Sequence, residues 1–492
     1  MFAAAVFGAL LSSLAISETA SAAEVSNWRI RDTLSVCQEI SKAVSSASAV
    51  YYPQNSSYAV DVEHYLATSS QEAACSVEPG TPEDVGVILQ ILGNTQTPFA
   101  VKGGGHASNP GFSSTTGVQV AMARFSGVTY NSGSQTVDIG AGLIWDDVYA
   151  ALEPYEVNVV GGRVTGVGVA GLTLGGGYSF LSNQYGLTVD TVTAYQLVLP
   201  NGTVSSITAS SNPDLFFALK GGFNNFGIVT QFTLKAYPQG QVWGGIIEAV
   251  DQFDAIAAAT ANFYANVTDA KAAILPTFNF ASNTPIGEVS IFYDGPTPPD
   301  GMFDEFLAIP ALSQDISTRS FLSLILSDPS NGTAGLRGYF NTVSLYEITP
   351  SILAAVANET LYWASQLESD VPGLFVSYDV EPFLPSVFSH GSDSAWPPSR
   401  ANAILPMNIY YSWNSSSSDS LINNVMQTSA SYLTSLAVSE GQAVSNAPLY
   451  PNYAIYDTPL SRMYDDNLSR LQSIKAQYDP DNVMGLTGGW KF

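Results

Sequence analysis

Charged side chains are scarce in this chain, and positive ones are the scarcest. Only 12% of the 492 residues are charged, and 16 Lys and Arg stand against 42 Asp and Glu, giving a net charge of −26. Without a basic surface that could displace counterions, nucleic acid and anionic membranes are excluded as partners. Apolar residues reach 46%, which excludes a disordered chain and predicts two or three globular domains.

Cysteine and histidine are almost absent, with two and three copies. Three scattered histidines exclude an ordinary zinc or iron site, so we expect no metal. The cysteines, Cys37 and Cys75, are expected to pair if the compartment is oxidising. The sequence also lacks a P-loop and a G-x-S-x-G elbow, which excludes nucleotidases and serine hydrolases that depend on these motifs.

Long hydrophobic runs are missing as well. The apolar stretch from Phe2 to Leu14 is too short to span a membrane, and it precedes the small residues Ala20-Ser21-Ala22. This pattern predicts a secretory signal over residues 1–22 and a secreted, extracellular protein. Seven Asn-X-Ser/Thr sequons agree with a glycoprotein: Asn55, Asn201, Asn266, Asn331, Asn358, Asn414 and Asn467.

Glycine, by contrast, is concentrated in two places. Lys102-Gly103-Gly104-Gly105-His106-Ala107 follows the apolar run Phe99–Val101, so a histidine stands at the edge of bare backbone. Consecutive glycines let backbone N–H groups approach a phosphate or a flat ring. The hexapeptide predicts a binding loop with a reactive histidine.

The second concentration runs from Gly162 to Gly177 and contains a formal G-x-G-x-x-G at Gly166, Gly168 and Gly171. A Rossmann fingerprint needs a strand before it and a helix that begins within it. Leu172-Thr173-Leu174 does not read as a helix start, so we disfavour a Rossmann site. The glycines are better explained as bare backbone along a long cofactor chain.

The pattern of apolar residues predicts the surrounding elements. Thr81 and Pro82 begin a helix that Gly93 ends. Further helices are expected at 145–152, 213–220, 253–267, 351–367 and 461–478. Strands are expected at 118–122, 136–139, 189–198, 204–208, 228–234, 288–293, 375–380 and 402–413.

Four motifs occur together and in order: Lys102–His106, Gly162–Gly177, Leu219–Val229, and Tyr450-Pro-Asn-Tyr453 followed by Asp479-Pro-Asp-Asn482. In these motifs the chain resembles secreted fungal-type FAD-linked oxidases of the berberine-bridge-enzyme-like branch. That branch lies in the vanillyl-alcohol oxidase and p-cresol methylhydroxylase superfamily. The resemblance implies an α+β fold, with a split FAD-binding domain of the p-cresol methylhydroxylase type and a substrate domain with an antiparallel sheet backed by helices. The implied boundaries are 23–237 and 448–492 for the FAD domain and 238–447 for the substrate domain.

The resemblance also implies site residues. His106 occupies the position that attaches covalently to the flavin 8α-methyl carbon. Some relatives carry a second link from a cysteine, but Arg163 or Val164 stands there, so one link is expected. Gly162 falls near the place where a small residue admits O₂. The implied cofactor-binding set is Gly103, Gly104, Gly105, His106, Ala107, Gly162, Val164, Gly166, Gly168, Gly171, Gly175, Gly176, Tyr178, Gly227, Ile228, Val229 and Asn482.

The base implied by the family is Tyr453, with Tyr450 lining the pocket. A free phenol has a pKa near 10, so we expect the site to lower the pKa of Tyr453. Asp379 and Glu381 could assist, but they read as surface carboxylates. His64 and His390 receive no role.

The expected reaction is oxidation of an alcohol or activated C–H bond of a small molecule by hydride transfer to flavin N5, after which O₂ is reduced to H₂O₂. The protein is expected to be a monomer. The substrate is either a carbohydrate or an apolar secondary metabolite, because the aromatic residues expected around the pocket suit both: Phe278, Phe280, Phe292, Tyr293, Phe375, Tyr378, Tyr410, Tyr411 and Trp413. Two other functions stay open, a dehydrogenase with another acceptor and a secreted flavin-binding glycoprotein without turnover.

Overall fold

The computed structural model describes residues 33–328 and 330–492, and the expected signal segment lies outside this part of the chain. Residues 33–43 are helical and carry Cys37, which bonds to Cys75 at the start of strand β2 with an S–S distance of 2.09 Å. The predicted cysteine pair is confirmed. Among the described helices none has the length and apolar character that a membrane crossing requires.

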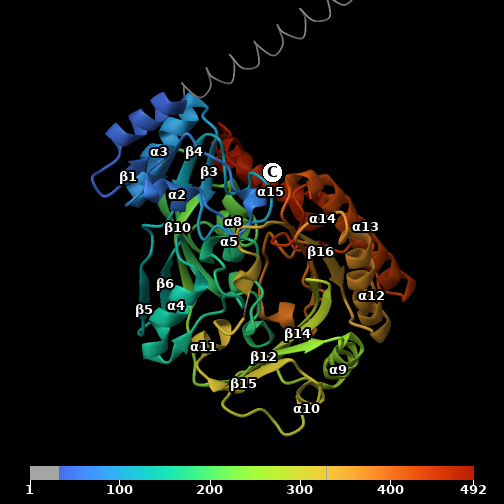
Figure 1. Ribbon diagram of the computed structural model, residues 1–492. Helices are drawn as coiled ribbons and strands as arrows, with labels where there is room; N and C mark the ends of the chain where they lie inside the picture. The colour runs from blue at the N-terminus through green and yellow to red at the C-terminus, as the bar shows by residue number, and fades with distance from the viewer. Residues whose placement is uncertain (1–32, 329) are drawn as a thin grey trace, which may run out of the picture.

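Two small sheets build the N-terminal half (Figure 1). A four-stranded sheet in the order β1-β2-β4-β3 is followed by a five-stranded antiparallel sheet in the order β5-β6-β10-β8-β9. The four-stranded sheet contains β1 (Ala49–Tyr51), β2 (Cys75–Glu78), β3 (Phe99–Lys102) and β4 (Val118–Ala121). The helices between these strands are α2 (Ser56–Val62) and α3 (Pro82–Thr95). The five-stranded sheet contains β5 (Val128–Asn131), β6 (Thr136–Gly140), β8 (Val192–Val198), β9 (Val204–Ile207) and β10 (Ile228–Lys235). A separate pair of short strands, β7 (Val157–Asn158) and β11 (Tyr237–Pro238), is antiparallel. The helices of this part are α4 (Trp145–Leu152), α5 (Val169–Leu174), α6 (Ser182–Tyr185), α7 (Thr188–Thr191) and α8 (Pro213–Leu219).

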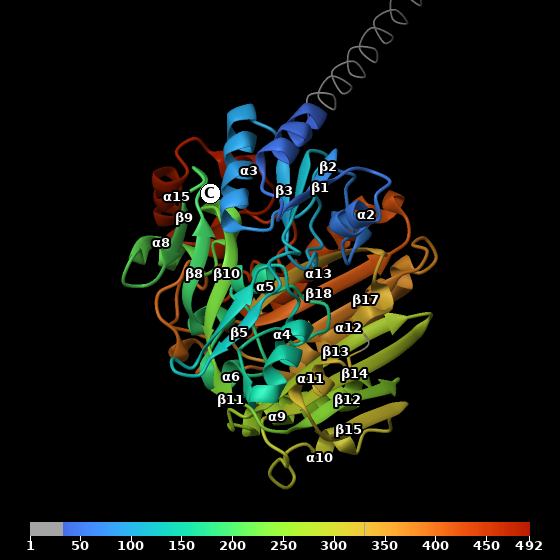
Figure 2. The same cartoon turned by 90° about the vertical axis from the view of Figure 1, so that its left-hand side faces the viewer.

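A seven-stranded antiparallel sheet follows, in the order β15-β12-β14-β13-β17-β18-β16 (Figure 2). Helices α9, α12 and α13 pack on one of its faces, as the resemblance implied. The elements are β12 (Val242–Val250), α9 (Phe253–Asn266), β13 (Ala272–Ala281), β14 (Thr284–Tyr293), α10 (Asp304–Leu307), β15 (Ser313–Arg319), α11 (Phe321–Ile325), β16 (Arg337–Leu345), α12 (Pro350–Leu367), β17 (Phe375–Val380), β18 (Leu405–Trp413) and α13 (Asp419–Ser439).

The chain then returns to the first half. Helices α14 (Ser461–Tyr464) and α15 (Asn467–Tyr478) lead to a terminus beside the N-terminal sheets (Figure 1). Thr487 forms a parallel bridge with Phe99. Short 3₁₀ turns complete the described chain at Ala67–Ser69, Glu153–Tyr155, Phe223–Asn225, Ser330–Thr333, Val387–His390, Ser416–Ser418 and Val483–Leu486.

Several predicted boundaries are wrong for local reasons. Helix α3 begins as expected, with the Thr81 hydroxyl accepting the Asp84 N–H, but it passes Gly93 and ends at Thr95. Gly93 serves close packing instead, since a Cβ there would lie 2.9 Å from Val483. The expected helix at 461–478 is two helices, because Asp465 adopts a positive φ of 41°.

Candidate active site

A cavity of about 640 Å³ lies between the N-terminal sheets, the seven-stranded sheet and the C-terminal segment. This volume is in the range of cavities that bind cofactors and small molecules. The predicted site residues that line it are Gly103, Gly104, Gly105, His106, Ala107, Val164, Gly168, Gly171, Tyr178, Ile228, Val229, Tyr450 and Tyr453. The structure thus brings together residues from all four motifs. Only the Asp479-Pro-Asp-Asn482 part of the last motif does not line the cavity.

The two glycine-rich segments touch on one wall of the cavity. A Cβ on Gly104 would lie 2.4 Å from the Gly168 Cα, so the two backbones meet at a distance that only glycine permits. Gly171 borders the cavity, and a Cβ built there meets no protein atom within 4 Å. The wall therefore leaves bare backbone facing open space, which suits a flat ring or an extended phosphate chain.

Polar atoms on the same wall lack protein partners. The side-chain oxygens Asn109 Oδ1 and Ser113 Oγ are buried and accept or donate no hydrogen bond in the described chain, although both residues line the cavity. Buried polar groups are nearly always hydrogen-bonded. Together with the glycines, these atoms fit a polar cofactor such as FAD.

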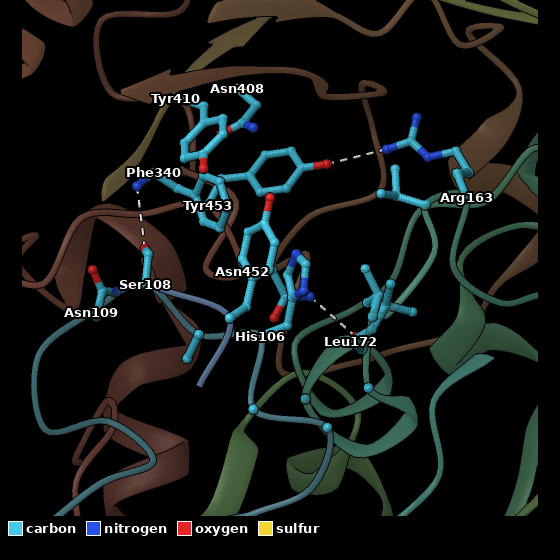
Figure 3. A pocket seen from close by; sticks show the side chains of 18 of the residues that line it. His106, Ser108, Asn109, Arg163, Leu172, Phe340, Asn408, Tyr410, Asn452 and Tyr453 are labelled. Atoms are coloured by element: carbon cyan, nitrogen blue, oxygen red, sulfur yellow. Dashed lines mark hydrogen bonds between the residues drawn. The ribbon is translucent and has the colours of Figure 1, made fainter. Parts of the chain in front are cut away.

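His106 stands over this wall (Figure 3). Its ring stacks on Tyr65, with centroids 4.3 Å apart, and faces Phe340 at 6.3 Å. Neither ring nitrogen has a hydrogen-bond partner among the described residues. Burial lowers the pKa of His106 to about 4, so the imidazole is neutral and its lone pair is free to react.

Tyr453 lines the cavity and has two polar partners, of which Figure 3 shows Arg163. Its hydroxyl donates to Glu381 Oε1 at 2.8 Å and accepts from Arg163 Nη2 at 3.2 Å. Arg163 Nη2 also lies 2.8 Å from Glu381 Oε2, and both of these side chains are buried. The three groups form a closed triangle of hydrogen bonds.

The electrostatics of this triangle correct two predictions. Burial raises the pKa of Tyr453 well above its usual range, and the Glu381 carboxylate raises it further against the opposing effect of Arg163. The expected lowering of the pKa of Tyr453 is therefore wrong, because the site is dry and its nearest anion favours the neutral phenol. Glu381 and Asp379 are not surface residues either: Glu381 is only 2% exposed, and Asp379 lines the cavity.

Tyr450 lies beside Tyr453 with its ring at 82° and a centroid distance of 4.8 Å. Its hydroxyl accepts hydrogen bonds from the Gly177 N–H at 3.1 Å and from Asn452 Nδ2 at 2.8 Å. Burial raises the pKa of Tyr450 to about 12. The residue fits the predicted lining role and holds the glycine run against the C-terminal segment.

Six predicted cofactor residues lie outside the cavity lining, namely Gly162, Gly166, Gly175, Gly176, Gly227 and Asn482. Gly162 packs on Trp145, since a Cβ there would lie 2.7 Å from the indole ring. Asn482 is exposed. The expectation about the second glycine run also needs correction, because helix α5 does begin within it, capped by Gly168.

The aromatic lining is smaller than predicted. Of the nine aromatic residues expected there, only Phe375 and Tyr410 line the cavity. The other seven do not line the cavity, because side chains along a strand alternate between the two faces of the sheet. Phe278, for example, packs against Phe253 of α9. Tyr65 and Phe340 also line the cavity but were not predicted, because they come from segments without a motif.

The remaining histidines have structural partners, as expected. His64 contacts the carbonyl oxygens of Val62 and Ser113, and His390 Nε2 lies 3.1 Å from the Asn183 carbonyl oxygen. Within the ranges that the structure describes, no group of three or more His, Cys, Asp or Glu could hold a metal ion.

Comparisons with known proteins agree with this site. Residues 73–208 match the FAD binding domain family, and residues 449–487, which contain Tyr450 and Tyr453, match the berberine and berberine-like family. An uncharacterized FAD-linked oxidoreductase of Arthroderma benhamiae is 34% identical over 77% of this chain and 78% of its own. The FAD-dependent monooxygenase drtC of Aspergillus calidoustus is 31% identical over 87% of this chain and 84% of its own.

This chain belongs to the berberine-bridge-enzyme-like FAD-linked oxidoreductases. Among solved structures, glucooligosaccharide oxidase from Acremonium strictum superposes with a TM-score of 0.73 and 17% identity, covering 89% of this chain and 95% of that one. The shared fold is the one that the four motifs predicted, with an FAD-binding domain and an antiparallel sheet domain. Gly104, Gly168 and Gly171 of the glycine-lined wall lie within residues 73–208, which match the FAD binding domain, and the seven-stranded sheet also lines the cavity.

Proposed function

We propose that this FAD-dependent oxidoreductase is an oxidase with its flavin attached through His106 alone. It would oxidise an alcohol or activated C–H bond of a small organic molecule with Tyr453 as base, and reduce O₂ to H₂O₂. The observation that carries the proposal is the hydrogen bond from Tyr453 to Glu381, within the cavity that also contains His106.

The residues facing the glycine-rich wall support the cofactor assignment. Gly103, Gly104, Gly168 and Gly171 leave room for the cofactor, and Asn109 and Ser113 offer unpaired polar atoms. The bound flavin would supply a hydride acceptor that can pass electrons on to oxygen. The neutral His106 is chemically able to form a bond through a ring nitrogen.

A second covalent link is not part of the proposal. Glucooligosaccharide oxidase from Acremonium strictum has a 6-S-cysteinyl, 8α-N1-histidyl FAD. Here the two residues that match the cysteine position are Arg163 and Val164, and Cys37 and Cys75 are bonded to each other.

The triangle around Tyr453 supplies a route for the proton. As the substrate loses its proton to the Tyr453 oxygen, the phenolic proton moves along the 2.8 Å hydrogen bond to Glu381 Oε1. Arg163 keeps Glu381 ionised beforehand, since a buried carboxylate without a counter-charge would already be protonated. A neutral phenol can thus act as a base because its own proton has an acceptor.

Two further assignments belong to the proposal. The domain division is 23–237 with 448–492 for FAD and 238–447 for substrate, in line with the separate seven-stranded sheet. Secretion after removal of residues 1–22 is supported by the disulfide, because such bonds persist in oxidising compartments.

The test is whether flavin stays with denatured protein. We expect acid-precipitated wild-type protein to be yellow, and the pellet of His106→Ala to be colourless. His390→Ala is the matched control, because its ring contacts a carbonyl outside the cavity. A colourless wild-type pellet would remove the covalent link, and flavin in neither fraction would remove the proposed function.

The name of the Aspergillus relative favours a second candidate, a monooxygenase. The two functions differ in the fate of oxygen. An oxidase releases one H₂O₂ for each substrate oxidised, whereas a monooxygenase places an atom from isotopically heavy O₂ in the product.

A further inference from the structure

The sheet side of the cavity carries a row of acidic residues. Glu248 of β12 lies directly opposite Glu288 of β14, which lies opposite Thr277 of β13. Thr277 in turn lies opposite Asp379 of β17, and Asp379 opposite Asn408 of β18. All five residues line the cavity, so three carboxylates lie on one line across its sheet side.

This row has little compensating charge. Arg163 is the one Lys or Arg among the described residues that line the cavity, and it is already paired with Glu381. Glu248 accepts a hydrogen bond from Ser313, and Asp379 accepts from Ser377 and Asn408. These neutral donors satisfy oxygen atoms but leave the negative charge in place.

Glu288 lies within the row, and its carboxylate has neither a hydrogen bond nor an ion pair within the described chain. Burial raises its pKa to about 8, and the carboxylates of Asp328, Glu248 and Asp379 add to the shift. Ionised Glu288 would lie opposite a like charge and without a partner, so the raised pKa means that a proton offsets this cost in the empty cavity. An arrangement so unfavourable in the empty cavity suits a positively charged ligand.

The shape of the row argues for an organic cation. Three strand spacings separate Glu248 from Asp379, and at about 4.8 Å per strand the row is roughly 14 Å long. A single metal ion needs ligands converging on one point, and the described residues offer no such cluster. Phe340, Phe375 and Tyr410 flank the row and can pack an apolar body.

We propose that the substrate carries a protonated amine, which the Glu288 carboxylate binds while Glu248 and Asp379 add to the negative potential along the row. The inference rests on the proposed function, because it places the substrate between this row and Tyr453. Asp379 precedes Glu381 by two residues, so the row ends beside the proposed base. An ammonium offers three donors and a full positive charge, whereas a neutral sugar offers donors only and an anion would be repelled.

The test is calorimetric titration of the flavin-loaded enzyme with matched amines and alcohols. The probes are phenethylamine with 2-phenylethanol, tyramine with tyrosol, and tryptamine with tryptophol, at about pH 8, where the amines are protonated. We expect each amine to bind about tenfold tighter than its alcohol or better, with a preference that weakens in high salt.

The variant Glu288→Gln keeps the shape of the side chain and removes one charge of the row. We expect its amine preference to fall to about twofold or less, which is the loss of one close ionic partner. Glu368→Gln is the matched control, because Glu368 is exposed just beyond α12 and carries the same charge. It should retain the full preference.

Equal or tighter binding of the alcohols, no binding of any amine, or an unchanged preference in Glu288→Gln would overturn the inference. Calorimetry detects binding without turnover, so the two proposals can fail separately. An amine preference without peroxide release would remove the oxidase function and keep the cationic substrate. Peroxide release from sugars or other neutral substrates, with no amine preference, would keep the oxidase function and remove the cationic substrate.

Discussion

Arg163 keeps a buried carboxylate ionised beside the proposed base. Its guanidinium lies 2.8 Å from Glu381 Oε2 and 3.2 Å from the Tyr453 hydroxyl. Burial is the largest single effect and lowers the pKa of Arg163, but Glu381, Tyr453 and Tyr450 together outweigh it, so the net shift is upward and the residue stays charged. Burial raises the pKa of Glu381 above its ordinary value, and Arg163 opposes this rise.

Replacing Arg163 by Met should therefore protonate Glu381 and remove the acceptor for the phenolic proton. We expect anaerobic flavin reduction to slow by about 10²-fold or more near neutral pH, which is the usual scale of acid–base catalysis. The rising limb of the pH–rate profile should move to higher pH. Stopped-flow reduction across a pH series measures both effects.

Two variants sharpen this experiment. Arg163→Lys keeps a positive charge and should recover part of the rate. It also tests the role of Arg163 if the Met variant does not fold. Arg470→Met breaks an exposed ion pair with Asp214 and should change nothing. A pH profile of Arg163→Met that coincides with wild type would remove the positioning role of Arg163.

A second prediction at the scale of one residue concerns Glu288 and the stability of the folded protein. Its folded-state pKa of about 8 lies above the unfolded value of 4.5, so the folded state binds the extra proton between these values. Its contribution to the free energy of unfolding is present at low pH and is lost as the pH rises toward 8.

In Glu288→Gln the side chain does not titrate, so this pH-dependent loss of unfolding free energy does not occur. We expect it to melt at a temperature close to that of wild type near pH 5 and a few degrees higher near pH 8. Thermal melting of both proteins across this window measures the difference. A gap that stays constant with pH, or that narrows as the pH rises, would contradict the raised pKa of Glu288.

At the scale of elements, the cavity depends on the contact between the two glycine-rich segments. A Cβ on Gly104 would lie 2.4 Å from the Gly168 Cα and 2.8 Å from its nitrogen. Backbone atoms cannot move aside as a flexible side chain can, so the loop after β3 would have to shift.

Gly104→Ala should therefore displace His106 and reduce flavin content, measured as the ratio of flavin to protein absorbance after purification. We expect a loss of about tenfold or more, by analogy with small displacements in active sites. Gly127→Ala is the control, because a Cβ there meets no atom within 4 Å. Full flavin content in Gly104→Ala would show that the close approach is dispensable.

The same glycines explain how far the sequence could predict the fold. Thirteen of the predicted site residues line the cavity, because the motifs that carried the resemblance are local in the sequence. The Thr81 cap and the β8–β9 hairpin were predictable for the same reason. Helix α5 was missed because Gly168 caps it and its six residues carry no periodic pattern.

The sheet side of the site was beyond such reasoning. Glu248, Glu288 and Asp379 are more than 35 residues apart in sequence, and only the strand order and register bring them into one row. Arg163 did leave a signal, a lone basic residue inside an apolar glycine run, but nothing local connects it to Glu381. The face chosen by each strand also decided which aromatic residues reach the cavity.

At the scale of the whole molecule, the site needs both ends of the described chain. The segment that follows the seven-stranded sheet carries Tyr450 and Tyr453 and then returns to the N-terminal sheets. Its last residues are held there by Asn225, which is fully buried. Asn225 Nδ2 donates to the Trp490 and Gly222 carbonyl oxygens, and Asn225 Oδ1 accepts the Phe492 N–H.

Asn225→Ala would leave these three backbone groups without partners inside the protein. At about 1 kcal/mol for each hydrogen bond, we expect a loss of roughly 3 kcal/mol in the free energy of unfolding, measured by denaturant titration. Asn262→Ala removes an amide whose bonds are exposed and should cost far less. Because Trp490 also lines the cavity, loosening the terminus should increase flavin loss as well as lower stability. Equal stability of the two variants would mean that the C-terminal segment is held by its apolar contacts alone, and that the cavity does not depend on this clamp.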